Sequence, residues 1–136
     1  MVRLVRAAAV PVLALSALAC CGGGEGPTPP EIPAGVWVGE GVRATVTVEG
    51  AVLVLDCAGA AIAPPLTLDA EGRFDLAGWW EHRGGPEPHT RRAARFGGRL
   101  HADRLTFVIT LADTAETRGP YELALGARGR PPVLCR

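Results

Sequence analysis

Apolar residues recur at every second position along much of the chain after Gly35. Between residues 42 and 48, Val42, Ala44, Val46 and Val48 alternate with polar or charged side chains. A period of two places alternate side chains on one face of a β-strand, whereas an amphipathic helix needs a period of 3.6. No segment has convincing helical periodicity, so the chain is predicted to be all-β.

Turn residues divide the remaining apolar runs into about eight short predicted strands. Asp69 and Gly72 lie between Leu68 and Phe74 in a sequence typical of a type I hairpin turn with a bulge. The expected strands cover residues 35–40, 42–48, 51–57, 62–68, the two neighbouring stretches 74–76 and 78–82 counted together, 94–100, 105–111 and 121–125. Residues 133–135 are expected to add a short last strand.

This many short strands in a small domain predict a single antiparallel meander that closes into a β-barrel, calycin-like in architecture. Closure is favoured because it leaves no exposed sheet edge, and a β-sandwich is the alternative. A barrel of about eight strands is either filled by its own side chains or encloses one small ligand. The sequence leaves that choice open.

The first residues predict export. Two arginines precede a mostly apolar run over residues 7–19, which is typical of a signal peptide and shorter than the roughly 20 residues of a membrane-spanning helix. Ala17-Leu18-Ala19-Cys20 resembles the lipobox of bacterial lipoproteins, which implies cleavage before a lipid-bearing cysteine. We therefore expect a signal peptide over residues 1–19 and lipidation at Cys20, with Cys21 as the alternative residue and a plain secretory signal as the alternative process.

Residues 20–34 are rich in Gly and Pro, which is typical of a partly extended spacer rather than a packed segment. The domain organisation expected is thus a signal peptide, a tether over residues 20–34 and a β-barrel domain over residues 35–136. The first expected partner is the membrane, through the lipid anchor. The expected location is the cell envelope, facing the periplasm.

The amino-acid composition argues against two classes of function, acyl transfer by a Ser or Lys nucleophile and nucleic-acid binding. All 14 basic residues are arginine and the only serine is Ser16, so the domain has no Ser or Lys nucleophile for acyl transfer. The 14 basic residues balance 14 acidic ones and aromatic residues make up 5% of the chain. Nucleic acid is therefore not an expected partner, because it calls for a basic face with stacking aromatic side chains.

Cys57 and Cys135 are the two cysteines of the domain. An even pair in an exported protein predicts a disulfide that ties the C-terminus to an early strand. A reactive or metal-binding cysteine is the alternative, without a C-x-x-C spacing to support it.

The segment from Trp79 to Arg95 is the least scaffold-like part of the chain, with two Trp, two His and several Arg residues. Trp79 and Trp80 are both candidates for contact with a ligand or a protein. Trp80 shares the parity of Phe74 and should enter the core, whereas Trp79 should point outward, where packing against the long loop is the alternative to recognition. Arg95 belongs to a cluster that predicts either an anion pocket or a solvated face, and the other members are Arg91, Arg92 and Arg99.

His82 and His89 are candidates for a transition-metal site. Glu81, Glu87 or His101 would supply a further ligand. The spacing matches no metal motif, so exposed loop histidines are the alternative interpretation, and no cofactor is predicted.

Two resemblances bear on the domain. Gly35-Val36-Trp37-Val38-Gly39-Glu40, Leu55-Asp56-Cys57-Ala58 and Gly72-Arg73-Phe74-Asp75 resemble a family of small, uncharacterised bacterial exported β-rich proteins over residues 35–135, which implies no known activity. Gly35-x-Trp37 is also similar to the Gly-x-Trp that opens lipocalin- and avidin-like barrels. That likeness implies that Trp37 closes one barrel end near a ligand cavity, with Arg128 or Arg130 as its partner.

The predicted function is a membrane-tethered, non-enzymatic lipoprotein that binds a small apolar ligand or another envelope component. The alternative is a structural or protein-interaction module with a filled barrel core. A third hypothesis is a metal-binding protein that uses His82 and His89.

Overall fold

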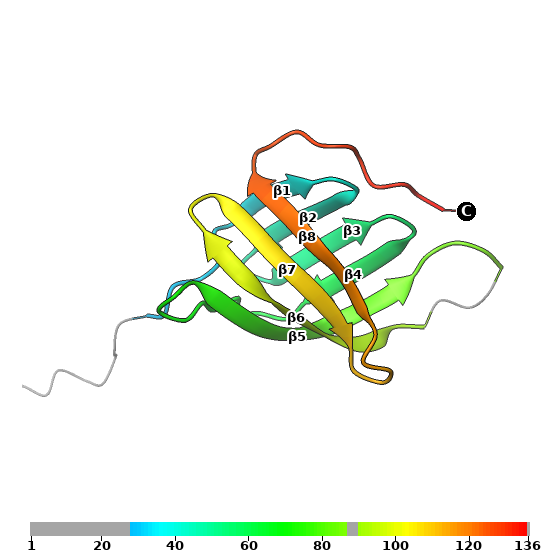
Figure 1. The fold of residues 1–136 in the computed structure, drawn as a ribbon, viewed down its shortest axis with the longest axis horizontal. Coiled ribbons are helices and arrows are strands. Elements are labelled where there is room, and N and C mark those ends of the chain that lie inside the picture. Colours follow the sequence, from blue (N-terminus) through cyan, green and yellow to red (C-terminus); the bar gives the residue numbers. More distant parts are fainter. Residues whose placement is uncertain (1–27, 87–89, 136) are drawn as a thin grey trace, which may run out of the picture.

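The computed structural model describes residues 28–86 and 90–135. The predicted signal peptide, the lipidation candidates Cys20 and Cys21, and His89 lie outside the described residues. In the described part, eight strands form one closed antiparallel barrel (Figure 1). Their bounds are β1 Gly35–Gly39, β2 Val42–Thr47, β3 Gly50–Leu55, β4 Ala58–Ile62, β5 Arg73–His82, β6 Arg92–His101, β7 Arg104–Leu111 and β8 Thr117–Leu125.

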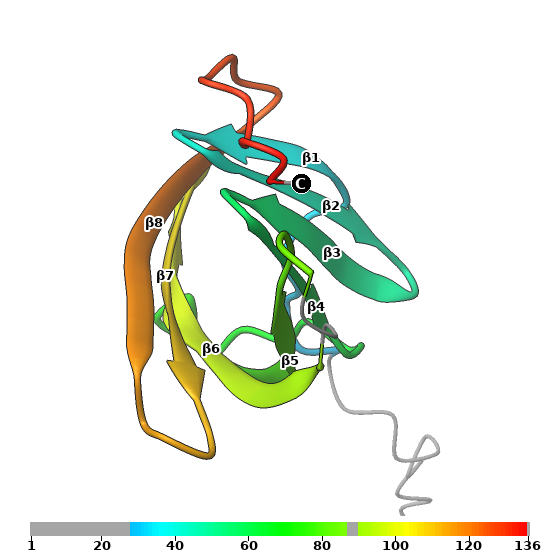
Figure 2. The ribbon, with the colours of Figure 1, turned by 90° about the vertical axis from the view of Figure 1, so that its right-hand side faces the viewer.

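Each strand pairs with the next along the chain, and β8 returns to pair with β1 from Trp37↔Leu125 to Gly39↔Leu123. The predicted all-β meander barrel is therefore confirmed. The curved sheet encloses one core, as the view along the barrel shows (Figure 2). The described residues contain no helix long and apolar enough to cross a membrane.

The alternating pattern of the sequence is the inside–outside pattern of the barrel wall. In β2, Val42, Ala44 and Val46 are buried, while the residues between them are exposed. Phe96 and Ile109 are completely buried at the centre, and no polar or charged side chain is buried in the described part. Burial of apolar surface is the main source of stability in such a fold.

The interior is filled by these side chains. The space left within the core next to Ala44, Leu53 and Phe107 measures about 10 Å³. That volume holds about one water molecule, whereas ligand pockets usually measure about 300–1,000 Å³. The side chains themselves thus occupy the barrel.

The expected strand over residues 62–68 is wrong. The strand at this point of the meander is β4, which ends at Ile62, and Pro64 and Pro65 then interrupt the ladder because proline has no N–H to donate. The following segment closes one end of the barrel instead. Ile32 N–H donates to the Leu66 carbonyl at 3.0 Å, and Leu68 N–H donates to the Pro30 carbonyl at 2.7 Å.

The predicted turn between Asp69 and Gly72 is present, and Gly72 has the left-handed φ of 79° that the turn requires. Its outgoing arm is β5, a single strand that joins the two predicted stretches 74–76 and 78–82. Its incoming arm, Leu66 to Leu68, is not a strand. The hairpin expected at this position is therefore only half correct.

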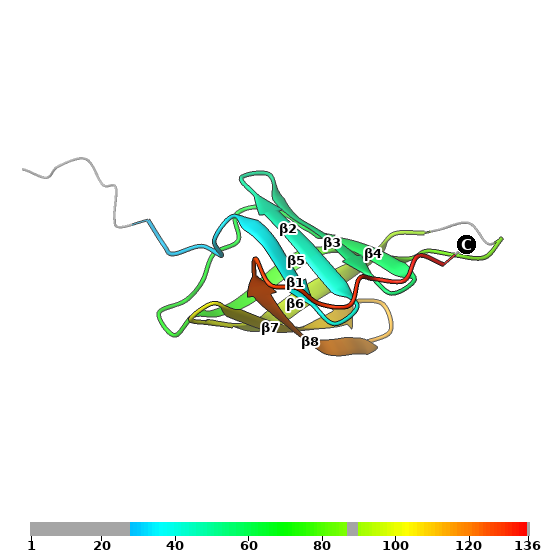
Figure 3. The same cartoon turned by 90° about the horizontal axis from the view of Figure 1, so that it is seen from above.

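The expected short strand over residues 133–135 is also wrong. Residues 126–135 form an irregular segment, here called the strap, which leaves β8 beside Val36, follows β1 along the barrel and reaches the β1–β2 and β3–β4 turns (Figure 3). The predicted Cys57–Cys135 disulfide is confirmed. One backbone hydrogen bond, from Cys57 N–H to the Val133 carbonyl at 2.9 Å, accompanies it.

The barrel has two distinct ends. The first, which we call the tether end, comprises the chain before β1 and the β2–β3, β4–β5 and β6–β7 connections. The second, the loop end, comprises the β1–β2, β3–β4, β5–β6 and β7–β8 connections and the last residues of the strap. The two ends lie on opposite sides of the molecule, with the N-terminal segment at one and the C-terminus at the other (Figure 1).

Candidate functional site

Several predicted site residues gather where β5 ends and β6 begins, at the loop end. Trp80 pairs with Arg92 and His82 pairs with Ala58 in the sheet register. Alternation along β5 then decides which side chains face the core and which face solvent.

The two tryptophans point in opposite directions, as their parity predicts. Trp80 is buried, with 7% of its surface exposed, and Trp79 lies half-buried on the outer wall. The Arg91 guanidinium stacks over the Trp79 ring at 4.0 Å from its centroid and lies 3.8 Å from Glu81. Trp79 is thus an outward-facing aromatic side chain that forms a cation–π interaction with Arg91.

Trp37 is a core residue, with 1% of its surface exposed. Its indole Nε1–H donates to the Pro33 carbonyl at 3.0 Å, which fastens the segment before β1 to the barrel. Neither arginine implied by the barrel-opening resemblance contacts Trp37 through a cation–π interaction within the described residues, where such contacts involve Trp79 and Trp80. Arg130 pairs with Asp56 at the loop end instead.

Arg95 lies on the outer wall. Its Nε–H donates to the Asp75 carboxylate at 2.9 Å, and a terminal nitrogen donates to the Asp75 backbone carbonyl at 3.3 Å. Arg92 points toward the mouth of the barrel and pairs with Asp113. Because Arg92 and Arg95 pair with different carboxylates, these two members of the cluster do not converge on one anion pocket.

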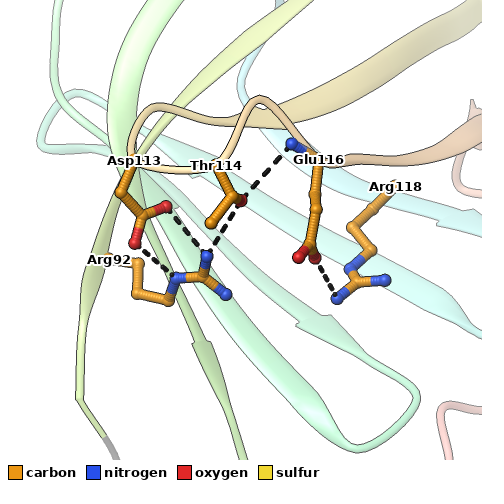
Figure 4. A network of polar contacts seen from close by, with 5 residues as sticks. All are labelled: Arg92, Asp113, Thr114, Glu116 and Arg118. Carbon is orange, nitrogen blue, oxygen red and sulfur yellow. Dashed lines mark hydrogen bonds and ion pairs between the residues drawn. The ribbon is translucent and has the colours of Figure 1, made fainter.

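A polar network covers the barrel mouth at the loop end (Figure 4). Arg92 donates to both oxygens of Asp113, at 2.8 and 3.1 Å, and to the Thr114 hydroxyl at 3.1 Å. The backbone N–H of Glu116 donates to the same hydroxyl at 3.4 Å, and Arg118 donates to the Glu116 carboxylate at 3.1 Å. Two guanidinium groups and two carboxylates therefore neutralise one another over the core.

Arg118 connects this network to the core, because its guanidinium lies 5.2 Å from the centroid of the Trp80 ring. The hydrogen bonds from Arg92 hold the pKa of Asp113 below its ordinary value. Asp113 thus stays ionised at neutral pH and is unsuited to act as a general acid. The network orders the β7–β8 loop against β6.

The histidine hypothesis receives no support from the arrangement of the described residues. His82 lies at the loop end, whereas His101 lies beside the β6–β7 turn at the tether end, so the two imidazoles cannot share a metal. Glu81 faces Arg83 at 3.1 Å. In residues 28–86 and 90–135, no group of three or more metal-ligating side chains comes together. His89 and Glu87 lie outside the described residues.

Sequence reasoning missed Asp56, which fastens the strap to the barrel. Asp56 accepts hydrogen bonds from two nitrogens of Arg130, at 2.6 and 3.2 Å, and from the Val133 N–H at 2.7 Å. The side-chain hydrogen bond from Arg130 is the main cause of its lowered pKa. The available signal was position alone, because Asp56 directly precedes the disulfide-forming Cys57 in a two-residue turn.

Comparison with protein families, with curated proteins and with solved structures finds no match to this chain. The resemblances drawn from the sequence therefore remain predictions.

Proposed function

We propose that this chain is a lipid-anchored, non-enzymatic protein of the bacterial cell envelope that binds another envelope component on the outside of its barrel. The leader over residues 1–19 would direct export, and Cys20, or Cys21 in the alternative register, would carry the lipid. The folded domain then serves as a rigid module held at the membrane.

The observation that carries the choice of a surface module is the filled interior. A barrel that transports an apolar molecule needs an internal cavity, and the space between the core side chains around Leu53 and Phe107 measures only about 10 Å³. The packed core therefore favours the interaction module over a ligand carrier. The disulfide and the Asp56–Arg130 pair also favour an interaction module, because they hold the strap in one position on the surface of the barrel.

The polar groups at the loop end support a non-catalytic role. The charges of the network over the barrel mouth are neutralised in two pairs, Arg92 with Asp113 and Arg118 with Glu116. A catalytic acid or base generally has a pKa tuned toward neutral pH, and the pKa of Asp113 moves in the opposite direction.

The test of the anchor uses the full chain expressed in a bacterium with an outer membrane, beside Cys20→Ala and Cys21→Ala variants. We expect the wild type and Cys21→Ala to partition with membranes and to carry a diacylglycerol mass on the mature N-terminus. Cys20→Ala should lose both. The opposite result for the two variants would select Cys21, and no lipid on either cysteine would refute the anchor.

The test of the filled barrel is native mass spectrometry of the same purified protein. We expect the protein mass plus lipid and nothing that is released on denaturation. A small apolar molecule that co-purifies in stoichiometric amount would instead support the ligand carrier.

A further inference from the structure

The tether end has an exposed apolar cluster at the base of the tether. Val48 is 93% exposed at the tip of the β2–β3 turn. Beside it, an open groove of about 350 Å³ runs between the chain before β1 and the β4–β5 connection. The exposed apolar residues that line this groove are Pro33, Ala34, Val48, Pro64 and Pro65, and we call them the tether-end cluster.

The length of the tether restricts what can meet this cluster. Eight peptide bonds separate Cys20 from Thr28, the first described residue. A fully extended chain spans about 3.6 Å per residue, so the lipid-bearing residue lies within about 29 Å of Thr28. A Gly-rich chain of this length has an average span of only about 16 Å. The Cys21 register shortens the tether by one residue.

We propose that the tether end lies on the bilayer, with Val48 and the neighbouring prolines in contact with lipid, so that the loop end projects away from the membrane. This inference rests on the lipid anchor proposed above. Ile32 N–H pairs with the Leu66 carbonyl at 3.0 Å, so the chain that leads to the anchor is fixed to this same end.

The contact needs the anchor, because the tether-end cluster is small. Tethering raises the effective concentration of the bilayer at the cluster, so a weak contact becomes well populated. Glu31 and Glu49 border the cluster, and neither forms an ion pair within the described residues. Anionic headgroups should therefore repel this end, and zwitterionic lipid should favour the contact.

The opposite end supplies a matched control. Leu134 in the strap is an aliphatic residue that is 76% exposed. It adjoins Cys135, which is bonded to Cys57 in the β3–β4 turn, whereas Val48 lies in the β2–β3 turn. Strand β3 separates these two turns by its six residues, about 20 Å at 3.3 Å per residue.

The experiment places a photoreactive phenylalanine analogue at position 48 or at position 134 of the full lipidated chain. The protein is reconstituted in phosphatidylcholine vesicles and irradiated, and lipid adducts are measured by mass spectrometry. We expect an adduct at position 48 and only background at position 134. Equal yields at the two positions, a higher yield at 134 or background at both would overturn the proposed orientation.

Two further arms test the chemistry of the contact. With the photoreactive residue at position 64, Val48→Glu should lose the lipid adduct, while Leu134→Glu at the far end should leave it unchanged. Replacing part of the phosphatidylcholine by phosphatidylglycerol should lower the yield at position 48. A yield that rises with anionic lipid or that ignores Val48→Glu would contradict the proposed contact.

The intact mass of the same samples separates the two proposals. A chain with lipid on Cys20 or Cys21 but no adduct at position 48 retains the proposed anchor and refutes the orientation. A chain without lipid on either cysteine refutes the anchor, and with it the premise of the orientation.

Discussion

Asp56 and Arg130, 74 residues apart in the sequence, form a two-point ion pair that joins the β3–β4 turn to the strap. A third hydrogen bond to Asp56 comes from the Val133 N–H, which donates to Oδ1 at 2.7 Å. Val133 lies two residues before Cys135, the disulfide partner of Cys57. A carboxylate and a covalent bond thus fasten the same segment to adjacent residues of one turn.

This relationship predicts an acid-sensitive strap. Because the pKa of Asp56 is lowered in the folded state, its contribution to stability is complete above the unfolded value of 3.8. The contribution is lost as the pH falls through the lower folded pKa. We expect exchange of the Val133 amide hydrogen to accelerate below about pH 4, relative to the buried strand amides.

Asp56→Ala removes the acceptor of the Val133 N–H, so it should give fast exchange of this amide at neutral pH and abolish the acid-dependent step. Asp75→Ala, which breaks the exposed pair with Arg95 on the opposite wall, is the matched control and should leave the strap unchanged. Slow exchange at Val133 in Asp56→Ala at neutral pH would mean that the disulfide alone orders the strap.

The Cys57–Cys135 disulfide should contribute more to the stability of the whole domain than the Asp56–Arg130 ion pair does. It joins residues 78 positions apart, and loop closure of that length stabilises a fold by about 4 kcal/mol in the chain-entropy estimate. We expect Cys57→Ser together with Cys135→Ser to lower the free energy of unfolding in urea by a value of that order. An unchanged urea midpoint would show that the bond constrains the strap and not the barrel.

Two adjacent glycines in β6 should respond in opposite ways to alanine. At Gly98 a Cβ would lie 2.0 Å from the Thr106 carbonyl oxygen and 2.7 Å from the Phe107 Cα, both of them backbone atoms. At Gly97 a Cβ would meet nothing within 4 Å. Gly98→Ala must therefore displace β7, whereas Gly97→Ala points into open space and removes chain entropy from the unfolded state.

We expect Gly98→Ala to lower the melting temperature clearly and Gly97→Ala to leave it equal or slightly higher. Thermal unfolding followed by circular dichroism measures both. Equal losses for the two variants would mean that any side chain in this part of β6 is unfavourable.

The fold could be predicted where one face of a strand is buried and the other is solvated. Strands β2, β6 and β7 follow that rule, and their period of two placed them correctly. Strand β4 has the sequence Ala-Gly-Ala-Ala-Ile and gives no alternating signal, because Ala60 pairs with Trp80 and the large ring occupies the space that a small residue leaves. This pairing of a small residue on β4 with a large one on β5 cannot be predicted from the sequence of either strand alone.

The candidate site shows the same limit. Parity along β5 predicted that Trp80 faces inward and Trp79 outward, because this depends only on the strand. The Arg92–Asp113 pair depends on how the β7–β8 loop folds over the barrel mouth, across 21 residues of sequence. Likewise, the apolar residues at 133–135 suggested a strand. The segment is instead held by the Asp56 carboxylate and the disulfide to Cys57.

The filled core gives the last prediction. Phe96 is completely buried at the centre of the barrel, 6.4 Å between ring centroids from Phe107. Phe96→Ala should lower the free energy of unfolding by about 3–5 kcal/mol, because the barrel wall cannot collapse into the space vacated. Val52→Ala, at an exposed aliphatic position on the outer wall, is the control and should change the free energy of unfolding by less than about 0.5 kcal/mol.

The cavity in Phe96→Ala should also bind a small apolar probe such as benzene, which the wild type excludes. Equal binding of benzene by the wild-type protein would contradict the filled interior on which the proposed surface function depends.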